Sequence, residues 1–252
     1  MPNWVSNVMH VVGRPDNIEK FKLALREKDG GDNVFDFNRF IKMPSQLENT
    51  AAPSLTEQIE FAKKSGVDPT KNMTELEVEA QLDKDAELRE KFGADNWYTW
   101  RLKNWGTKWN SCDAEIVEEI VQSNGIVNLT YHFSTPWSTP NGIIDALAPM
   151  AKAMRLTIDI YSEEEGMYFD CVTRITPNSY EKNIGQPFYY LEGDDGNLYQ
   201  IDGLEDDEIK ELGLDPDDVT ASQRGFVCDN TGDLFIDFER TDKKVVYAKE
   251  KS

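Results

Sequence analysis

The stretch "IVNLTYHFST", residues 126–135, alternates apolar and polar side chains along its length. Val127, Leu129, Tyr131 and Phe133 fall on one side of an extended chain, and polar residues separate them. Because successive side chains of a β-strand point to opposite faces, this alternation predicts a strand in a sheet that is covered on one face only.

The segments on either side extend this pattern into a sheet with helices. Strands are predicted at 4–12, 34–44 and 156–166, and amphipathic helices follow the first strand and the strand at 126–135. The order β-α-β, insertion, β-α-β predicts a ferredoxin-like split-βαβ domain, in which two helices cover one face of a four-stranded antiparallel sheet. We expect the first and third strands to be parallel neighbours at the centre of this sheet.

Three further regions differ from this pattern. Residues 45–95 lack alternation and carry helical fragments, which predicts a helical insertion in a first domain of residues 1–165. Residues 111–125 fit a short helix or irregular structure. Residues 166–252 hold short strands with Gly- and Asp-rich turns, which predicts a small acidic β-rich C-terminal module. The fold class expected is therefore α+β.

The charge of the chain is strongly negative and unevenly distributed. The 252 residues include 47 acidic and 27 basic side chains, a formal charge of −20, and residues 161–252 hold 23 of the acidic and 9 of the basic ones. This field repels nucleic acid and anionic lipid, because contacts with phosphate need Lys or Arg. We therefore expect a basic protein as the partner, and direct binding of nucleic acid is disfavoured.

The cysteines and the N-terminal sequence bear on the location of the protein. Cys112, Cys171 and Cys228 are isolated thiols without a C-x-x-C spacing, which is typical of a reducing compartment. No signal peptide and no apolar segment of about 20 residues is visible. These features predict a cytoplasmic protein that does not interact with a membrane.

Four of the six tryptophans lie within residues 97–111, at positions Trp97, Trp100, Trp105 and Trp109. One hypothesis makes them an aromatic platform for bases or a peptide. The other, which we favour, makes them a structural plug at the rim of the sheet, joined by Trp137, because indoles contribute large buried areas. A small basic patch keeps the binding hypothesis open, including a nucleic-acid-binding protein that uses Trp105 and Trp109. The patch consists of Arg101, Lys103 and Lys108.

The two histidines are the main candidates for catalysis. His10, His132 and Asp159 are predicted to share the uncovered face of the sheet, where they could form a metal-binding triad or an acid–base pair. No motif flanks them, so ordinary surface histidines are favoured, and we expect no metal or other cofactor. The sequence contains no P-loop, nucleophile elbow, zinc-protease motif or dinucleotide fingerprint.

Three stretches resemble one family in the same order along the chain. "MPNWVSN" at residues 1–7, "NWGTKWNS" at 104–111 and "YHFSTPWSTP" at 131–140 are similar to YubB-like proteins. The resemblance covers roughly residues 1–165 and implies a ferredoxin-like domain in a protein of a plasmid or bacteriophage, located in the cytoplasm of a bacterial host. It implies no reaction.

The acidic tract near residues 192–218 is the remaining candidate site. It lacks the ligand spacing of an EF-hand loop. A solvated charged surface is one interpretation. The other is a surface that mimics DNA phosphates and occupies a basic groove of a nucleic-acid-binding or defence protein of the host. We therefore expect a non-enzymatic accessory protein. The candidate binding residues are Asp194, Asp195, Glu205, Asp206, Asp207, Glu208, Glu211, Asp215, Asp217 and Asp218.

Overall fold

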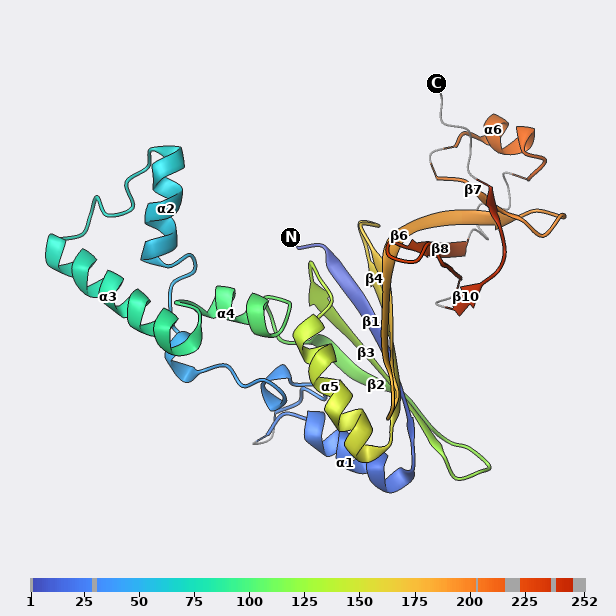
Figure 1. Cartoon of the computed structure of the whole chain (residues 1–252), viewed down its shortest axis with the longest axis horizontal. Helices are drawn as coiled ribbons and strands as arrows, with labels where there is room; N and C mark the ends of the chain where they lie inside the picture. The colour runs from blue at the N-terminus through green and yellow to red at the C-terminus, as the bar shows by residue number, and fades with distance from the viewer. Residues whose placement is uncertain (1, 29–30, 203, 216–222, 237–238, 247–252) are drawn as a thin grey trace.

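A single large sheet organises the computed structural model of this chain (Figure 1). The structure describes residues 2–28, 31–202, 204–215, 223–236 and 239–246. The sheet has 11 strands, and nine of them follow the order β10-β9-β8-β6-β5-β4-β1-β3-β2. The four strands at one end are β1 (Trp4–Gly13), β2 (Cys112–Val121), β3 (Val127–Pro136) and β4 (Thr157–Glu164).

These four strands are antiparallel to their neighbours throughout. β1 lies between β3 and β4 and runs antiparallel to both, so the parallel pairing of the first and third strands predicted from the sequence is wrong. The connection from β1 through a helix returns the chain in the same direction in β2. The hairpin that follows reverses it, so β3 must oppose both strands.

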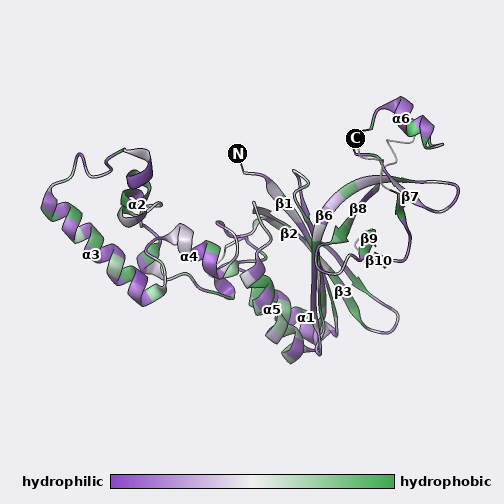
Figure 2. Cartoon of the chain, turned by 45° about the horizontal axis from the view of Figure 1, so that its top comes forward, coloured by the Kyte–Doolittle hydropathy of each residue, from purple (hydrophilic) through white to green (hydrophobic). Residues whose placement is uncertain are grey.

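Two helices cover one face of this part of the sheet. They are α1 (Pro15–Leu25) and α5 (Asn141–Met154), and Figure 2 shows α5 as largely hydrophobic. Ile18 and Phe21 of α1 and Leu147 of α5 are fully buried in the main core, where they join the inward side chains of the strands. The prediction from the alternation at 126–135 is correct for the covered face, because Leu129, Tyr131 and Phe133 are buried.

Two local predictions are wrong. Residues 34–44 form no strand but contain a 3₁₀ turn, Phe37–Arg39, whose N-cap Asp36 accepts a hydrogen bond from the Asn38 backbone N–H. Phe35 and Phe37 are buried in the main core instead. Residues 111–125, expected as a short helix or irregular structure, contain strand β2 and the turn after it, because β2 pairs along β3 from end to end.

The strands after residue 166 continue the same sheet. β6 has 13 residues, pairs with β5, β7 and β8, and bends as it leaves the helix-covered part (Figure 1). An ion pair between the buried carboxylate of Asp170 in β5 and the half-buried guanidinium of Arg224 in β8 joins these strands. The remaining elements are β5 (Asp170–Ile175), β6 (Tyr180–Glu192), β7 (Leu198–Gln200), α6 (Asp206–Glu211), β8 (Gln223–Cys228), β9 (Leu234–Ile236), β10 (Glu239–Thr241) and β11 (Val245–Val246).

The helical insertion projects away from the sheet (Figure 1). It contains a 3₁₀ turn (Ser45–Leu47) and the helices α2 (Leu55–Ser65) and α3 (Glu75–Phe92), and α4 (Trp97–Asn104) leads back to β2. Ser54 and Thr74 begin α2 and α3 with capping boxes, and Gly66 and Gly93 end them in the left-handed conformation. Within the described part of the chain, every helix is too short or too polar to cross a lipid bilayer.

Candidate binding groove

The tryptophan cluster divides into an inner and an outer pair. Trp100 and Trp105 are 5% and 0% exposed, and their ring centroids lie 5.9 Å apart in an edge-on arrangement. The indole N–H of Trp105 donates to the backbone carbonyl of Ile41 at 2.7 Å. Trp97 and Trp109 are only half-buried. The structural plug therefore describes the inner pair, and the outer pair remains available at the surface.

Gly106 allows the inner pair to sit against α5. Its φ of +85° is in the left-handed region that favours glycine. A Cβ at this position would lie 2.6 Å from the backbone nitrogen of Asn141, at the start of α5. Helix α4 thus ends where the backbone around Gly106 closely approaches the start of α5.

The three basic residues near the tryptophans have different roles. The guanidinium of Arg101 lies 5.1 Å from the ring of Trp97 and 4.9 Å from that of Trp105. Burial lowers the pKa of Arg101 from its ordinary value, and the charge of Glu48 opposes this change. Lys103 Nζ donates to the carbonyl of Gly93. Arg101 and Lys103 are thus held by the fold, and Trp105, which the nucleic-acid hypothesis needs for stacking, is buried.

Lys108 is the exception among these basic residues. Its Nζ lies 4.1 Å from the ring of Trp109 and 6.0 Å from that of Trp137, which is 53% exposed. The ring centroid of Trp109 in turn lies 5.9 Å from that of Trp4, the first residue of β1. Among the described residues, no carboxylate lies within ion-pair distance of Lys108. An ammonium group is therefore presented on an aromatic surface.

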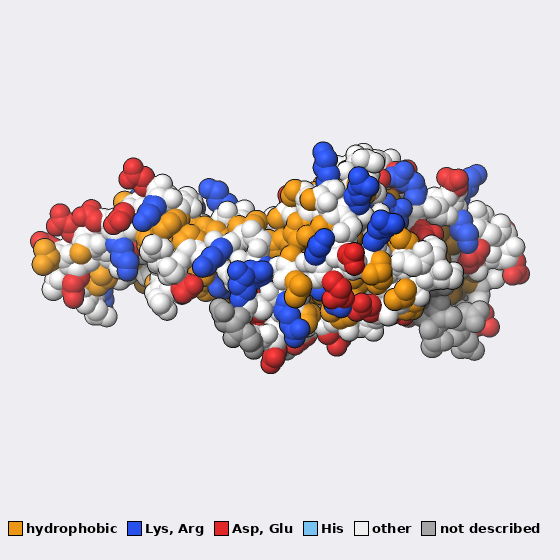
Figure 3. Space-filling model, turned by 90° about the horizontal axis from the view of Figure 1, so that it is seen from below, with side chains coloured by type: hydrophobic (Ala, Val, Ile, Leu, Met, Phe, Trp, Pro, Cys, Tyr) orange, Lys and Arg blue, Asp and Glu red, His pale blue; other side chains and the backbone are white. Residues whose placement is uncertain are grey.

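A groove lies between α2 and this aromatic surface. Its volume is about 850 Å³, and apolar groups form most of its wall. Figure 3 shows apolar side chains at the surface where the insertion joins the rest of the molecule, and acidic side chains at the far end of the insertion. The lining residues are Ala52, Pro53, Glu57, Gln58, Phe61, Val67, Pro69, Trp97, Tyr98, Thr99, Lys108 and Trp109.

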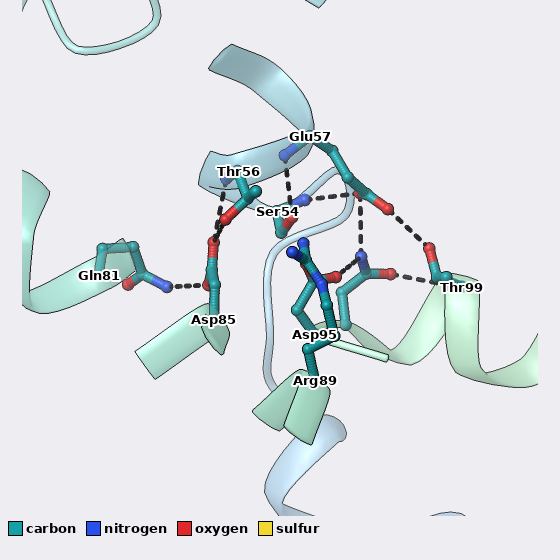
Figure 4. A network of polar contacts seen from close by, with 9 residues as sticks. Ser54, Thr56, Glu57, Gln81, Asp85, Arg89, Asp95 and Thr99 are labelled. Atoms are coloured by element: carbon teal, nitrogen blue, oxygen red, sulfur yellow. Dashed lines mark hydrogen bonds and ion pairs between the residues drawn. The ribbon is translucent and has the colours of Figure 1, made fainter. Parts of the chain in front are cut away.

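A polar network fixes the two walls of the groove relative to each other (Figure 4). The carboxylate of Glu57 in α2 accepts hydrogen bonds from the Ser54 backbone at 3.0 Å, from the buried amide of Asn96 at 3.0 Å and from the Thr99 hydroxyl at 2.9 Å. Asn96 caps α4, so this one carboxylate joins α2 to α4.

The same network attaches α3. The buried carboxylate of Asp85 accepts from the backbone and hydroxyl of Thr56, both at 3.1 Å, and from the amide of Gln81 at 2.7 Å. An ion pair between Arg89 and Asp95 closes the other side (Figure 4). Polar contacts thus join α2, α3 and the start of α4 to one another.

Replacing Glu57 with alanine is expected to loosen α2 by about 1–3 kcal/mol, because the buried amide of Asn96 loses one of its two acceptors. Hydrogen exchange of the α2 amides measures this change, and the amides of α5 provide the internal control. Exchange that accelerates equally in α2 and α5 would contradict a local role for Glu57.

The structure brings the two histidines to the uncovered face, as predicted. His10 Nδ1 lies 2.9 Å from the Thr130 hydroxyl, and His132 Nε2 lies 3.1 Å from the Ser6 hydroxyl. Both imidazoles are half-buried, and Tyr161, which lies beside His10, packs against a cluster that includes Phe226 and Phe235.

The third member of the proposed catalytic set is engaged elsewhere. Asp159 is the neighbour of His10 across the β1–β4 pair, but its two oxygens accept from Arg174 at 2.7 and 3.2 Å. Within the described ranges, no group of three or more His, Cys, Asp or Glu side chains is placed to hold a metal ion. The geometry therefore gives the metal-binding alternative no support.

The acidic candidates surround the distal end of the sheet. Asp194 and Asp195 lie in the β6–β7 turn, Glu205, Asp206, Asp207, Glu208 and Glu211 lie on or next to α6, and Asp215 follows it. All are exposed except Glu208, which is half-buried. Hydrogen bonds from the backbone and side chain of Asn197 lower the pKa of Asp195. The candidates Asp217 and Asp218 lie outside the described residues.

The sequence interpretation missed the α2 side of the groove. Phe61 and Val67 are 69% and 68% exposed, and both line it. Large apolar residues in the otherwise polar insertion were the available signal. Their meaning depends on α4 lying opposite, about forty residues away along the chain.

Comparison with known proteins gives a match that covers strands of the sheet and two residues of the groove, Lys108 and Trp109. The family model described as "Ferredoxin-like domain in Api92-like protein" matches residues 104–176, which span β2 to β5. The chain contains a ferredoxin-like domain. The match begins at the end of α4, so β1 and the insertion precede the matched segment.

Among solved structures, the protein Api92 from Yersinia pseudotuberculosis is similar to this chain. The similarity covers 74% of this chain and 98% of that protein, with 10% sequence identity and a TM-score of 0.39. No curated protein matches the sequence.

Proposed function

We propose that this chain is a non-enzymatic binding protein whose groove, between α2 and the outer tryptophans, holds a short segment of a partner protein. The observation that carries the proposal is the largely apolar groove of about 850 Å³. Ligand pockets in proteins have volumes of about 300–1,000 Å³, with mostly apolar walls and a few polar groups. Aromatic side chains of this kind dominate the energetics of protein interfaces.

The polar groups of the groove favour one kind of segment. Glu57 and Thr99 are hydrogen-bonded to each other within the wall. Lys108 presents its ammonium group beside Trp109. A segment that places an aromatic or large aliphatic side chain in the groove and an Asp or Glu next to it would complement both features. The partner segment is therefore an apolar–acidic peptide.

Selection from a displayed library of random ten-residue peptides tests this assignment. The wild-type chain is expected to enrich peptides with an aromatic residue next to an acidic one. Phe61→Ser and Lys108→Glu are expected to weaken their binding at least tenfold. Leu76→Ser, at a position that is 77% exposed and outside the groove, is the matched control. No enrichment, or equal binding by Phe61→Ser, would refute the proposal.

A second candidate function rests on the exposed carboxylates around α6. Five acidic candidates on or next to α6 and two in the β6–β7 turn are exposed, which supports binding of a basic host protein by charge complementarity. Mimicry of DNA towards a nucleic-acid-binding or defence protein is its most specific form. The resemblance to YubB-like proteins of plasmids and bacteriophages supports an accessory protein of such an element.

A neutralised variant tests the second candidate. Glu205→Gln, Asp206→Asn and Asp207→Asn together should abolish the capture of basic host proteins at low salt. Glu75→Gln, Glu79→Gln and Glu87→Gln remove the same number of charges from exposed positions of α3 and should leave capture unchanged. Equal losses in both variants would point to net charge alone.

A further inference from the structure

Strand β2 forms one end of the sheet and is open along its outer side. In the described part of the chain, β3 is the single strand that pairs with β2. β2 has ten residues, and the last five of them, from Val117 to Val121, are all exposed. An edge strand of this length presents a row of backbone N–H and C=O groups that can pair with another strand.

Apolar side chains are also exposed along the edge that β2 forms. Val117, Ile120 and Val121 are 52%, 47% and 66% exposed. Ala114 and Ile116, by contrast, pack against the main core. The exposed apolar side chains thus concentrate in the half of the strand that extends toward the β2–β3 turn.

The charged side chains of β2 determine which kind of strand can pair with it. Asp113, Glu115, Glu118 and Glu119 are exposed along it, and β2 contains no basic residue. Glu115 and Glu118 lie on the uncovered face, opposite His132 and Thr130, and Glu119 lies on the helix side, paired with Lys22 of α1 at 2.9 Å.

Like charges placed opposite each other on paired strands are destabilising. Two register shifts, next to Glu115 and Glu118, further disfavour pairing with an identical strand. Pairing of β2 with the β2 strand of a second copy is therefore disfavoured. A strand with basic side chains would not be repelled by the carboxylates of β2.

We propose that β2 binds an extended segment of a partner protein in which Lys or Arg alternates with Val or Ile, and that this segment adds a strand to the sheet. Backbone hydrogen bonds supply the affinity, as in other cases of strand addition. The carboxylates of Glu115 and Glu118 select the basic side chains, and the exposed valines contact the apolar ones. This site is separate from the groove and does not depend on it.

Fluorescence anisotropy with a labelled ten-residue peptide of alternating Lys and Val tests the proposal. The full chain is expected to bind it. The same peptide with every backbone amide methylated keeps its charges and side chains but loses its hydrogen-bond donors, and its binding should be at least tenfold weaker. Equal binding of the two peptides would show that charge alone acts, and no binding of the first peptide would refute the site.

Matched variants locate the binding on β2. Glu115→Lys with Glu118→Lys should weaken binding at least tenfold. Glu75→Lys with Glu79→Lys makes the same change of charge on exposed positions of α3 and should have less than a twofold effect. Phe61→Ser, which tests the groove, should bind this peptide normally. Equal effects of the two double variants would overturn the proposal. A wild-type dimer that the β2 variant abolishes would do the same, because the occupant would then be a second copy of the chain.

Discussion

Replacing Trp105 with alanine is expected to lower the free energy of unfolding by about 3–5 kcal/mol, the usual cost of truncating a buried large aromatic residue. Trp105 is fully buried and packs edge-on against Trp100 and Phe37, with centroid distances of 5.9 and 5.8 Å. It also supports Arg101, which lies over its ring. The substitution would leave a cavity where α4, the residues around Phe37 and α5 meet.

Two further substitutions separate the contributions of Trp105. Trp105→Phe keeps most of the packing but leaves the carbonyl of Ile41 without its donor, so a smaller loss of about 1–3 kcal/mol is expected. Trp137→Ala, at a position that is 53% exposed, should change the stability by less than about 1 kcal/mol. Urea unfolding followed by circular dichroism measures all three. A cost below about 1 kcal/mol for Trp105→Ala would mean that the plug does not stabilise the fold.

Replacing Arg224 with alanine is expected to cost about 3–5 kcal/mol at neutral pH, because it leaves a buried carboxylate without its cation. Asp170 is 1% exposed, and Arg224 donates to it and, at 3.0 Å, to the carbonyl of Glu164. Burial raises the pKa of Asp170 above its ordinary value of 3.8, and Arg224 opposes this increase. Without Arg224 the pKa of Asp170 should rise further.

The cost of losing Arg224 should therefore depend on pH. A carboxyl group whose pKa is higher in the folded state binds protons more strongly there, so its protonation stabilises the fold. This contribution is complete below the unfolded pKa near 3.8 and disappears as the pH rises through the folded pKa. The deficit of Arg224→Ala relative to wild type should shrink as the pH falls from 7 toward 5.

A double variant is the control for this pair. Asp170→Asn with Arg224→Met removes both charges and should recover most of the lost stability, since a buried pair as a whole contributes little net free energy. Urea unfolding at several pH values measures the series. A deficit of Arg224→Ala that is constant with pH would show that lost packing, rather than the unpaired carboxylate, causes it.

The sequence was sufficient for the strands with one buried face. The alternation of Val127, Leu129, Tyr131 and Phe133 is a local property, and the strands at Trp4–Gly13 and Thr157–Glu164 show it as well. These strands and the two helices behind them account for the ferredoxin-like domain and the large antiparallel sheet.

β2 could not be predicted in the same way. Ile116, Val117, Ile120 and Val121 have a spacing that fits a helix as well as a strand, and pairing with β3 decides between them. Residues 34–44 show the opposite error. Their phenylalanines were interpreted as a strand, but Phe35 and Phe37 instead fill a gap in the core next to Trp105.

Only part of the candidate site could be predicted from the sequence. The tryptophans are conspicuous, but which of them face outward depends on Gly106 and on the start of α5. The second wall of the groove comes from Phe61 and Val67, and Glu57 sets its position through Asn96 and Thr99. Such long-range contacts leave no periodic signal in the sequence.

The position of β1 has a consequence for synthesis on the ribosome. β1 is made before its neighbours β3 and β4, which begin only at Val127 and Thr157. At a translation rate of about 5–20 residues per second, β1 waits roughly 6–23 seconds before synthesis of β3 begins. During that interval its apolar side chains are available to chaperones, so the yield of native protein should respond to codon usage across the insertion.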